Sequence, residues 1–560
     1  MVSPDAIIEA SEDTQSPDTY RKALENSGEL LMHFISKRSV LLALHLYKTS
    51  SKKKQKTSET IMDILILSIS LSLFSLLLAL NFLLRPHRQN LPPTPFFRLP
   101  IIGHLHLIKH PLHRILHNLS KKYGHVFSLR FGSRLVVIIS SPSVVQECFT
   151  KNDIILANRP LLGTGKHLAY NHTTMAVAPY GEHWRNLRRI GALELFSTSR
   201  INLFSRMREE EVKALMVRLC GSSSLEGFRA VEMESMLLDL MYNVIMRMMG
   251  GKKDCEEDEG KSKEFREMVT KIMAVGGASN PGDFIAIWNW IDPSGWKKKI
   301  MKLGQTMDVL LQDLVDGIRN ENGEGNTMLH RLLHLQKIEP ENHSDQIIKG
   351  LIQIILIAGV DTTAVTLEWA LSHLLNNPDV LQKAKLEIDN VVGQERLVSE
   401  VDLPSLTYLQ GIIFETLRLS PAAPLLVPHC SFEDCKIGGY DVPRDTIVII
   451  NAWAIHRDPN LWEDASSFKP ERHTNPIGVE SYKFLPFGLG RRACPGIGIA
   501  QKMANLTLAT MIQCFEWERE GSSLVDMSEG EGLTMPKAQP LIAKCKPRPI
   551  MKAVFSVERV

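Results

Sequence analysis

The stretch FGLGRRACPG, residues 487–496, places one cysteine in a loop with three glycines, two arginines and a proline. An apolar run, GIGIAQKMANLTLATMIQCFEW, begins at Gly496, and we expect it to form a helix whose N-terminus lies beside Cys494. The positive end of a helix dipole and nearby arginines both favour a thiolate. Because a thiolate acts either as a nucleophile or as a metal ligand, Cys494 is the first candidate for chemistry in this chain.

The composition of the 560-residue chain is that of a globular protein with a large core, with 44% hydrophobic and 23% charged residues. The net charge of +3 is too small to indicate a nucleic-acid partner, and we expect no nucleic acid. The eight cysteines are scattered, without a C-x-x-C pair or the spacing of zinc ligands. This pattern indicates reduced thiols that face the cytosol, because a secreted disulfide framework would be denser.

The N-terminal region contains an uncharged run, Ile64 to Leu84, that is long enough to span the roughly 30 Å hydrocarbon core of a membrane. Its length and the lack of a small-residue cleavage site argue against a signal peptide. The Arg85, His87 and Arg88 that follow, and then a proline-rich break, argue against a buried core helix. We therefore predict a single transmembrane anchor at residues 62–85 and a proline-stiffened hinge at 86–103.

Residues 1–61 are polar and end in the basic tract SSKKKQKTSET. Its lysines would hold the N-terminus in the cytoplasm, whereas Arg85 and Arg88 would hold the following chain there, and one anchor cannot satisfy both. Because Met62 directly precedes the apolar run, we expect translation to start there and residues 1–61 to be a disordered extension. Acidic residues in this extension argue against a transit peptide.

The pattern of residues 104–560 predicts one mainly helical domain with a small β-rich part. VFSLRFG and RLVVIIS, between 126 and 140, alternate like strands, and a long helix is predicted from the N-cap Ser344 to the residue before Pro378. The middle of this helix, AGVDTT at 358–363, contains hydroxyls that can bond back to the helix and open a groove for a diatomic ligand. A polar patch in an ordinary core helix would fit the same residues.

Two further pairs of residues lie about one helical turn apart. Glu415 and Arg418 form either a surface ion pair or, together with Arg472, a buried network that fixes a loop. Trp184 and Arg188 suit a carboxylate held by an indole N–H and a guanidinium, or a tryptophan packed under an arginine.

The cysteine loop satisfies the pattern F-x-x-G-x-R-x-C-x-G, with Phe487, Gly490, Arg492, Cys494 and Gly496. In this pattern, and in A-G-x-D-T-T, E-x-x-R, P-E-R and W-x-x-x-R in the same order, the chain from Met62 onward resembles the cytochrome P450 monooxygenases. The resemblance implies the helical P450 fold, with a haem-thiolate monooxygenase domain at 104–560 behind the anchor. One departure is His473, where the family usually has phenylalanine after P-E-R, and it puts the local packing in question.

The resemblance also implies roles for individual residues. Haem b would be the cofactor, and its iron would be the one metal site. Cys494 would be the proximal ligand of this iron, and the Cys494 thiolate would favour cleavage of the O–O bond. Thr362 with Asp361 resembles the family's catalytic acid–alcohol pair, which supplies protons for oxygen activation. The other cofactor-binding residues implied are Arg492, Trp184 and Arg188 as clamps of the haem propionates, His429 as a further contact, and Phe487, Gly488 and Gly496 in the loop.

Four more stretches, NAWAIHRDP, IGGYDVPRDT, TLEWALSHLLNNP and GRRACPG, resemble plant microsomal A-type members. The most similar branch contains isoflavone hydroxylases and lignan methylenedioxy-bridge enzymes. This implies insertion of one oxygen atom from O2 into a small hydrophobic secondary metabolite of aromatic, phenylpropanoid, isoflavonoid or lignan type. A terpenoid or xenobiotic substrate, a haem-thiolate isomerase or dehydratase, and a non-catalytic haem sensor are the alternatives. We expect the segments 163–181, 422–428 and 533–536 and the helix near Ala358 to line a mostly apolar pocket.

The chain has no glycine fingerprint for a flavin or nicotinamide in a strand–turn–helix context. Electrons are therefore expected from NADPH through a separate flavoprotein, NADPH-cytochrome P450 reductase, that docks at the basic face with Lys483 and Arg491. The anchor implies contact with membrane lipid. It also implies a single-pass location in the endoplasmic reticulum membrane with the catalytic domain facing the cytosol.

Overall fold

The computed structural model of the chain describes residues 64–73, 75–76, 90–221, 227–251, 259–277, 280–285, 287–288, 292–320, 325–473 and 482–552. The chain divides into two compact units, Met1–Arg88 and Gln89–Val560. In the first unit, Ile64–Leu73 forms an exposed apolar helix within the predicted anchor. Most of the rest of residues 62–85, and the whole predicted extension 1–61, lie outside the described residues.

The second unit is built around the long helix α14 (Asp345–Asn376), as predicted. The Ser344 side chain accepts a hydrogen bond from the Ile347 N–H and so caps its start, and α15 (Pro378–Val391) begins directly after it. Among the described residues, α14 is the one helix long and apolar enough to cross a membrane, but two thirds of that apolar window is buried inside the protein. It is therefore the central core helix of this unit.

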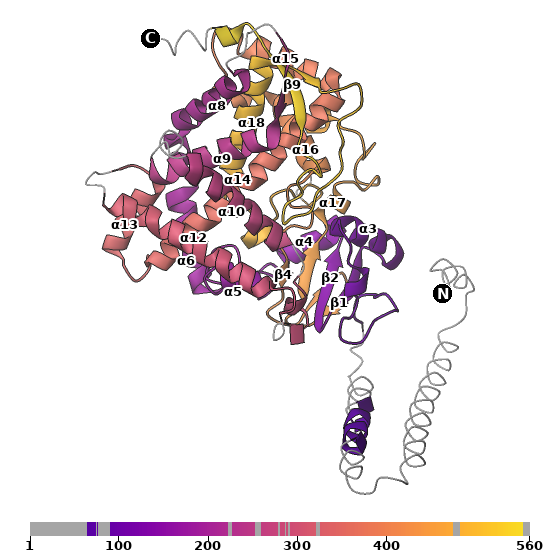
Figure 1. Cartoon of the computed structure of the whole chain (residues 1–560). Coiled ribbons are helices and arrows are strands. Elements are labelled where there is room, and N and C mark those ends of the chain that lie inside the picture. The colour runs from indigo at the N-terminus through magenta and orange to yellow at the C-terminus, as the bar shows by residue number, and fades with distance from the viewer. Residues whose placement is uncertain are drawn as a thin grey trace, which may run out of the picture. The chain divides into compact units, whose positions relative to one another are not determined.

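Helices α9 (Met233–Gly250), α16 (Thr407–Leu419) and α18 (Ile497–Cys514) pack against α14 (Figure 1). Buried apolar side chains from these helices form one large continuous core. The remaining helices of four or more residues are α3 (Leu112–Tyr123), α4 (Pro142–Thr150), α5 (Gly163–Leu168), α6 (Glu182–Ile190), α7 (Thr198–Leu203), α8 (Ser205–Cys220), α10 (Glu259–Gly277), α12 (Trp296–Arg319), α13 (Met328–Ile338) and α17 (Ala452–Ile455), with a π-turn at Gly191–Leu195 and a 3₁₀ turn at Pro470–His473.

The predicted strands at 126–140 are β1 (Val126–Phe131) and β2 (Arg134–Ile139), which pair antiparallel. β7 (Ile447–Ile450) pairs parallel to β2, and β4 (His429–Cys430) pairs antiparallel to β7. Separate apolar clusters cover the two faces of this small sheet, which lies beside α3 in Figure 1. The other sheets are β3 (Arg229–Glu232), β9 (Ile542–Pro547) and β8 (Phe515–Arg519), paired in that order, and the hairpin of β5 (Cys435–Ile437) and β6 (Tyr440–Val442).

The described end of the predicted hinge packs on this sheet. The Ser128 N–H donates to the carbonyl of Pro93 at 2.7 Å, and Gly103 forms a bridge with Phe131. Gly103 has a φ of +64°, and a Cβ there would lie 2.4 Å from the carbonyl oxygen of Arg130, so the close approach needs a glycine. Residues 93 and 103 thus belong to the second compact unit, Gln89–Val560.

Candidate functional site

The loop 487–496 folds back on itself directly before α18. The Cys494 N–H donates to the carbonyl of Phe487 at 2.9 Å, which closes the loop. Gly488 and Gly490 have φ angles of +66° and +67°, in the left-handed region that favours glycine. Since Gly496 is the residue before the first turn of α18, Cys494 lies at the N-terminal end of this helix, where the sequence predicted it.

The environment of the Cys494 thiol does not favour a thiolate on its own. The residue is exposed, although protein atoms surround much of the sulfur. This burial raises the pKa of the thiol, while the N–H of Gly496 and the charge of Arg188 act in the opposite direction and do not compensate. The helix N-terminus and the nearby arginine thus act in the direction expected from the sequence, but burial has the larger effect. A further positive partner, such as a metal ion, would favour a thiolate at this position.

Three arginines around the loop, Arg159, Arg188 and Arg492, are bound by main-chain carbonyls instead of carboxylates. Within the described part of the chain none of the three has an acidic partner. The acceptors are the carbonyls of Ala157 (2.6 Å) and Met175 (3.2 Å) for Arg492, of Ala493 (2.7 Å) for Arg188, and of Val427 (2.7 Å) and Pro428 (2.9 Å) for Arg159.

This arrangement concentrates positive charge in a partly desolvated place. Burial lowers the pKa of Arg159 to about 10, and burial together with the neighbouring Arg159 and Arg188 lowers the pKa of Arg492 to about 9. Buried like charges repel one another and are stabilised by an anion. The cluster therefore suits a ligand that carries carboxylates. Sequence reasoning missed Arg159, whose only signal is its place in the apolar segment IILANRP.

Trp184 and His429 lie at the edge of this arginine cluster. The Trp184 indole donates to the carbonyl of Met175 at 3.1 Å, and the Arg492 guanidinium lies 4.3 Å from the centre of its ring. The structure thus has a tryptophan packed under an arginine, but that arginine is Arg492, not Arg188. His429 Nδ1 lies 2.8 Å from the carbonyl of Leu156 and must donate to it. Burial lowers the pKa of His429 to about 3, so the ring is neutral.

The middle of α14 has an accessible strip. Ala358 is exposed although most of the helix is buried, and the Thr362 hydroxyl donates to the Ala358 carbonyl at 2.6 Å, the back-bond predicted from the sequence. Asp361 instead accepts a hydrogen bond from the Thr534 hydroxyl at 2.6 Å. Burial raises the pKa of Asp361, and the Thr534 bond lowers it in part. Asp361 and Thr362 are neighbours in sequence, but they are bonded to different partners.

The cysteine loop is also tied to α4 and the turn after it. The Arg491 N–H donates to Asp153 Oδ1 at 3.1 Å, and the Arg491 guanidinium lies 3.2 Å from the other carboxylate oxygen. A Cβ on Gly490 would lie 2.3 Å from Asp153 Oδ1. Sequence reasoning assigned Arg491 to the surface that meets a redox partner and missed Asp153. Because Arg491 is paired with Asp153, only part of its positive charge is available to attract such a partner.

Glu415 and Arg418 form a buried network, not a surface pair. Both side chains are fully buried, and Arg418 donates to the two oxygens of Glu415 at 2.7 and 2.8 Å. Arg472 Nε lies 3.3 Å from Glu415 Oε1, as the buried-network interpretation predicted. His473 Nε2 lies 2.9 Å from Glu415 Oε2, so the residue that departs from the family pattern is a fourth member of the network.

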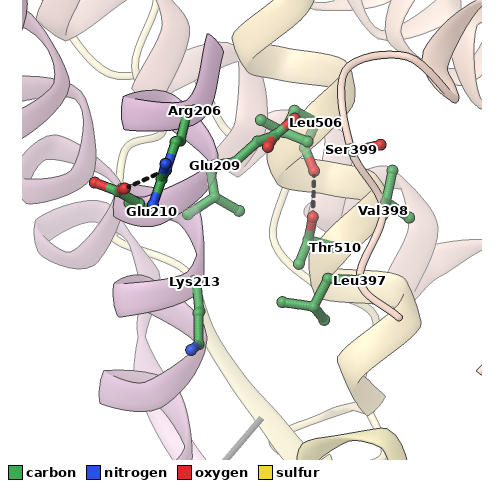
Figure 2. A pocket seen from close by; sticks show the side chains of 10 residues that line it. Arg206, Glu209, Glu210, Lys213, Leu397, Val398, Ser399, Leu506 and Thr510 are labelled. Carbon is green, nitrogen blue, oxygen red and sulfur yellow. Dashed lines mark hydrogen bonds and ion pairs between the residues drawn. The ribbon is translucent and has the colours of Figure 1, made fainter. Parts of the chain in front are cut away.

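A groove of about 230 Å³ lies between α8, residues 397–399 and α18. In Figure 2, Arg206, Glu209, Glu210 and Lys213 come from α8 on one side, and Leu397, Val398 and Leu506 come from the other side. None of the predicted site residues lines this groove. It is therefore separate from the cysteine loop and from the accessible strip of α14.

Comparison with known proteins identifies the family. Residues 92–543 match the family model described as Cytochrome P450. The chain is a cytochrome P450. It is similar to an isoflavone 2'-hydroxylase of Glycyrrhiza echinata (49% identity over 88% of this chain and 100% of that protein) and to a (+)-piperitol/(+)-sesamin synthase of Sesamum radiatum (49% over 83% and 92%). A solved zebrafish cytochrome P450 structure with progesterone has a TM-score of 0.68 at 26% identity, covering 79% of this chain and 100% of that one.

These matches confirm the family and the branch that the sequence predicted, and they confirm the mainly helical fold with small sheets. As a cytochrome P450, the protein is a monooxygenase with a haem cofactor, a small-molecule substrate and a redox partner that supplies electrons from NADPH. The chain fits this cofactor. Cys494 is an accessible thiol that needs a positive partner, and the arginines beside it need an anion, so an iron porphyrin with two propionates meets both requirements.

Proposed function

We propose that this cytochrome P450 inserts one oxygen atom of O2 into a small hydrophobic aromatic plant metabolite of isoflavonoid, lignan or other phenylpropanoid type, from the membrane of the endoplasmic reticulum. The observation that carries the proposal is the accessible Cys494 beside three arginines for which the described residues provide no acidic partner. When bound, the haem supplies the iron at which dioxygen is reduced and from which one oxygen atom passes to the substrate.

In this proposal Cys494 binds the iron, and the Gly496 N–H tunes the charge on the sulfur. Arg492 and Arg188, which now donate to main-chain carbonyls, would hold the propionates, with Trp184 as an indole donor beside them. Arg159 is an additional clamp. His429 is the weakest contact, because its neutral ring already donates its Nδ1 proton to a carbonyl. Phe487 and Gly488 hold the shape of the loop.

Asp361 and Thr362 serve as the proton-carrying pair. The exposed Ala358 gives this part of α14 an open face, and the Thr362 hydroxyl lies on it within its own helix. Because burial raises the pKa of Asp361, its carboxyl holds a proton closer to neutral pH than an exposed aspartate does. A carboxyl whose pKa is raised in this way suits a proton relay to the Thr362 hydroxyl.

The substrate class follows from the relatives and from how the predicted pocket segments connect. The relatives are named for the hydroxylation of isoflavones and for the synthesis of piperitol and sesamin. Arg159 donates to carbonyls in both 163–181 and 422–428, and the Met535 N–H donates to the Ala422 carbonyl at 2.9 Å. The three segments are thus held together by hydrogen bonds, which supports one shared and mostly apolar pocket.

Membrane attachment rests on the anchor 62–85 and on an apolar surface of the catalytic domain. Phe96, Phe97 and Ile101 are each at least two thirds exposed, and Trp288 is also exposed. The segment with Phe96, Phe97 and Ile101 approaches the segment with Phe284 and Trp288, because residues 131–133 contact both Gly103 and Phe284. Exposed aromatic and aliphatic side chains of this kind suit contact with lipid.

We accordingly propose the domain order of extension (1–61), anchor (62–85), hinge (86–103) and cytosolic catalytic domain (104–560). The net charge of +3 supports the absence of a nucleic-acid partner.

The test uses the full chain in membranes, reduced and exposed to carbon monoxide. Ligation by Cys494 gives the red-shifted Soret band of a haem thiolate, which is lost in Cys494→Ser and kept in the matched control Cys435→Ser. Turnover with NADPH and reductase is then measured on isoflavones, lignans and terpenoids, with incorporation of ¹⁸O from ¹⁸O2 into the product. Product formation from a hydroperoxide without reductase would instead support the isomerase or dehydratase alternative.

A further inference from the structure

The loop 533–541, between β8 and β9, is attached to α14 by three hydrogen bonds. The Thr534 hydroxyl donates to Asp361 Oδ2 at 2.6 Å, the Trp369 indole donates to the Met535 carbonyl at 2.8 Å, and the Leu541 N–H donates to Glu368 Oε1 at 2.8 Å. Two of these bonds join a loop main-chain group to a buried side chain of α14, and such bonds fix a loop firmly. The Thr534 bond is the only one of the three that involves Asp361.

The same loop contacts the predicted substrate pocket. The Met535 N–H donates to the carbonyl of Ala422, and the Leu533 N–H donates to the carbonyl of Met273 on α10 at 3.2 Å. The loop therefore connects α10 and the segment 422–428 on one side with α14 on the other. A displacement of this pocket wall acts directly on the hydrogen-bond partner of Asp361.

Thr534 is the principal polar contact of Asp361 among the described residues. Asp361 forms no ion pair within the residues that the structure describes, and the Thr534 hydroxyl is the donor to its carboxylate. Glu234 on α9 faces it, and burial, Glu232 and Asp361 together raise the pKa of Glu234. Further away, Glu368 interacts with Glu234, Glu232 and Lys537. No positive side chain among these contributes to the protonation of Asp361, so one hydroxyl has a large share in setting it.

We propose that Thr534 is a positioning residue that holds the Asp361 carboxylate against the loop 533–541 and thereby sets its direction and its protonation. The inference rests on the proposed role of Asp361 and Thr362 in proton transfer and adds to it a link with the pocket wall. In the described conformation Asp361 is bonded toward the loop and Thr362 toward Ala358. Proton transfer between the two needs a carboxyl oxygen of Asp361 to reach the Thr362 hydroxyl, and the Thr534 bond opposes this by holding Oδ2 toward the loop.

The test compares Thr534→Val, which keeps the shape and removes the hydroxyl, with Thr534→Ser, which restores it. Thr510→Val is the matched control, because Thr510 is a buried threonine whose hydroxyl bonds only to the Leu506 carbonyl of its own helix. The first measurement is amide hydrogen exchange of the resting haem-loaded protein over 533–541. In Thr534→Val we expect exchange of the amides of residues 533–535 to rise about fivefold, the effect of losing about 1 kcal/mol. The Thr534→Ser and Thr510→Val proteins are expected to exchange like the wild type.

The second measurement is the pH dependence of product formed per NADPH consumed. The Thr534 bond lowers the pKa of Asp361, so its removal keeps the carboxyl protonated to higher pH and moves the alkaline limb of coupled turnover upward. Thr534→Ala is expected to shift the limb in the same direction, and Thr534→Ser to return it. In an Asp361→Asn background, Thr534→Val should shift nothing further.

The outcomes separate this inference from the proposed function. If Asp361→Asn changes coupling while Thr534→Val changes neither loop exchange nor the pH limb, the positioning role is refuted and the proton pair stands. If Asp361→Asn leaves coupling and its pH dependence unchanged, the proton role of Asp361 is refuted, and the inference falls with it. A lower rate in Thr534→Val with an unmoved pH limb indicates a structural role only and also refutes the inference.

Discussion

Replacing Glu415 by glutamine tests whether the buried network of Glu415, Arg418, Arg472 and His473 depends on charge. Glu415 Oε1 receives Arg418 at 2.7 Å, the Lys469 N–H at 2.9 Å and Arg472 at 3.3 Å, while Oε2 receives Arg418 at 2.8 Å and His473 at 2.9 Å. Every neighbour is a donor. A glutamine amide in either orientation therefore points its NH2 group at two or more donors and leaves Arg418 without a counter-charge.

The expected loss of stability is large. Removing one partner of a buried ion pair costs about 3–5 kcal/mol, because the remaining charge stays buried and uncompensated. Whole domains are stable by only about 5–15 kcal/mol. Both side chains here have no exposed surface, and Arg418 also donates to the carbonyls of His456 and Ala465, so it cannot swing out to water without breaking these bonds as well. Glu415→Gln should therefore lose at least about a fifth of the free energy of unfolding.

The assay is urea unfolding of the haem-loaded protein, followed by circular dichroism and by the carbon monoxide band. The matched control is Glu471→Gln, since Glu471 pairs with Lys383 at the surface, where about half of each side chain is exposed. We expect no measurable change in the control. A Glu415→Gln protein that unfolds within about 1 kcal/mol of the wild type would refute the argument, because the geometry would then not require a charge at this position.

Three further predictions concern single positions. His473→Phe removes the bond to Glu415 and also the buried His473 Nδ1, which has no hydrogen-bond partner among the described residues. The two effects should nearly cancel, and unfolding should change by less than about 1 kcal/mol in the same titration. Gly490→Ala should abolish the carbon monoxide band, since φ is +67° and the new Cβ would collide with Asp153. Burial would raise the pKa of Glu529, but hydrogen bonds from two basic side chains hold it at about 2 against an ordinary 4.5. Its stabilisation is therefore present above pH 4.5 and lost as the pH falls toward 2, and Glu529→Gln should flatten this part of the stability curve.

The sequence predicted the elements whose signal is local. Ser344 and Pro378 bound α14 because a cap and a helix breaker act on the adjacent backbone, and the alternation at 126–140 predicted β1 and β2 in the same way. The glycines of the cysteine loop were equally readable, since a left-handed φ restricts the residue type. Contacts between distant segments were not readable. Arg159, Asp153 and Thr534 belong to no local pattern.

The electrostatics of the site were the least predictable part. A helix N-terminus and two arginines near Cys494 led to the expectation of a thiolate, but burial has the larger effect and raises the pKa of the thiol. Burial depends on everything that packs around the loop, and one segment of sequence does not contain that information. The same applies to Glu415 and Arg418, whose spacing fits a surface pair and a buried network equally well.

The two features that the polypeptide leaves uncompensated lie side by side. One is a thiol whose surroundings oppose its charged form, and the other is a group of guanidiniums that contact carbonyls but no carboxylate of the described part of the chain. A porphyrin with an iron and two propionates supplies a positive centre to the first and negative groups to the second, so binding it removes both costs together. Haem affinity and folding stability should then be coupled. A change that weakens the arginine cluster, such as Arg492→Gln, should lower haem retention more than it lowers the stability of the haem-free chain, because the substitution also relieves repulsion among the arginines.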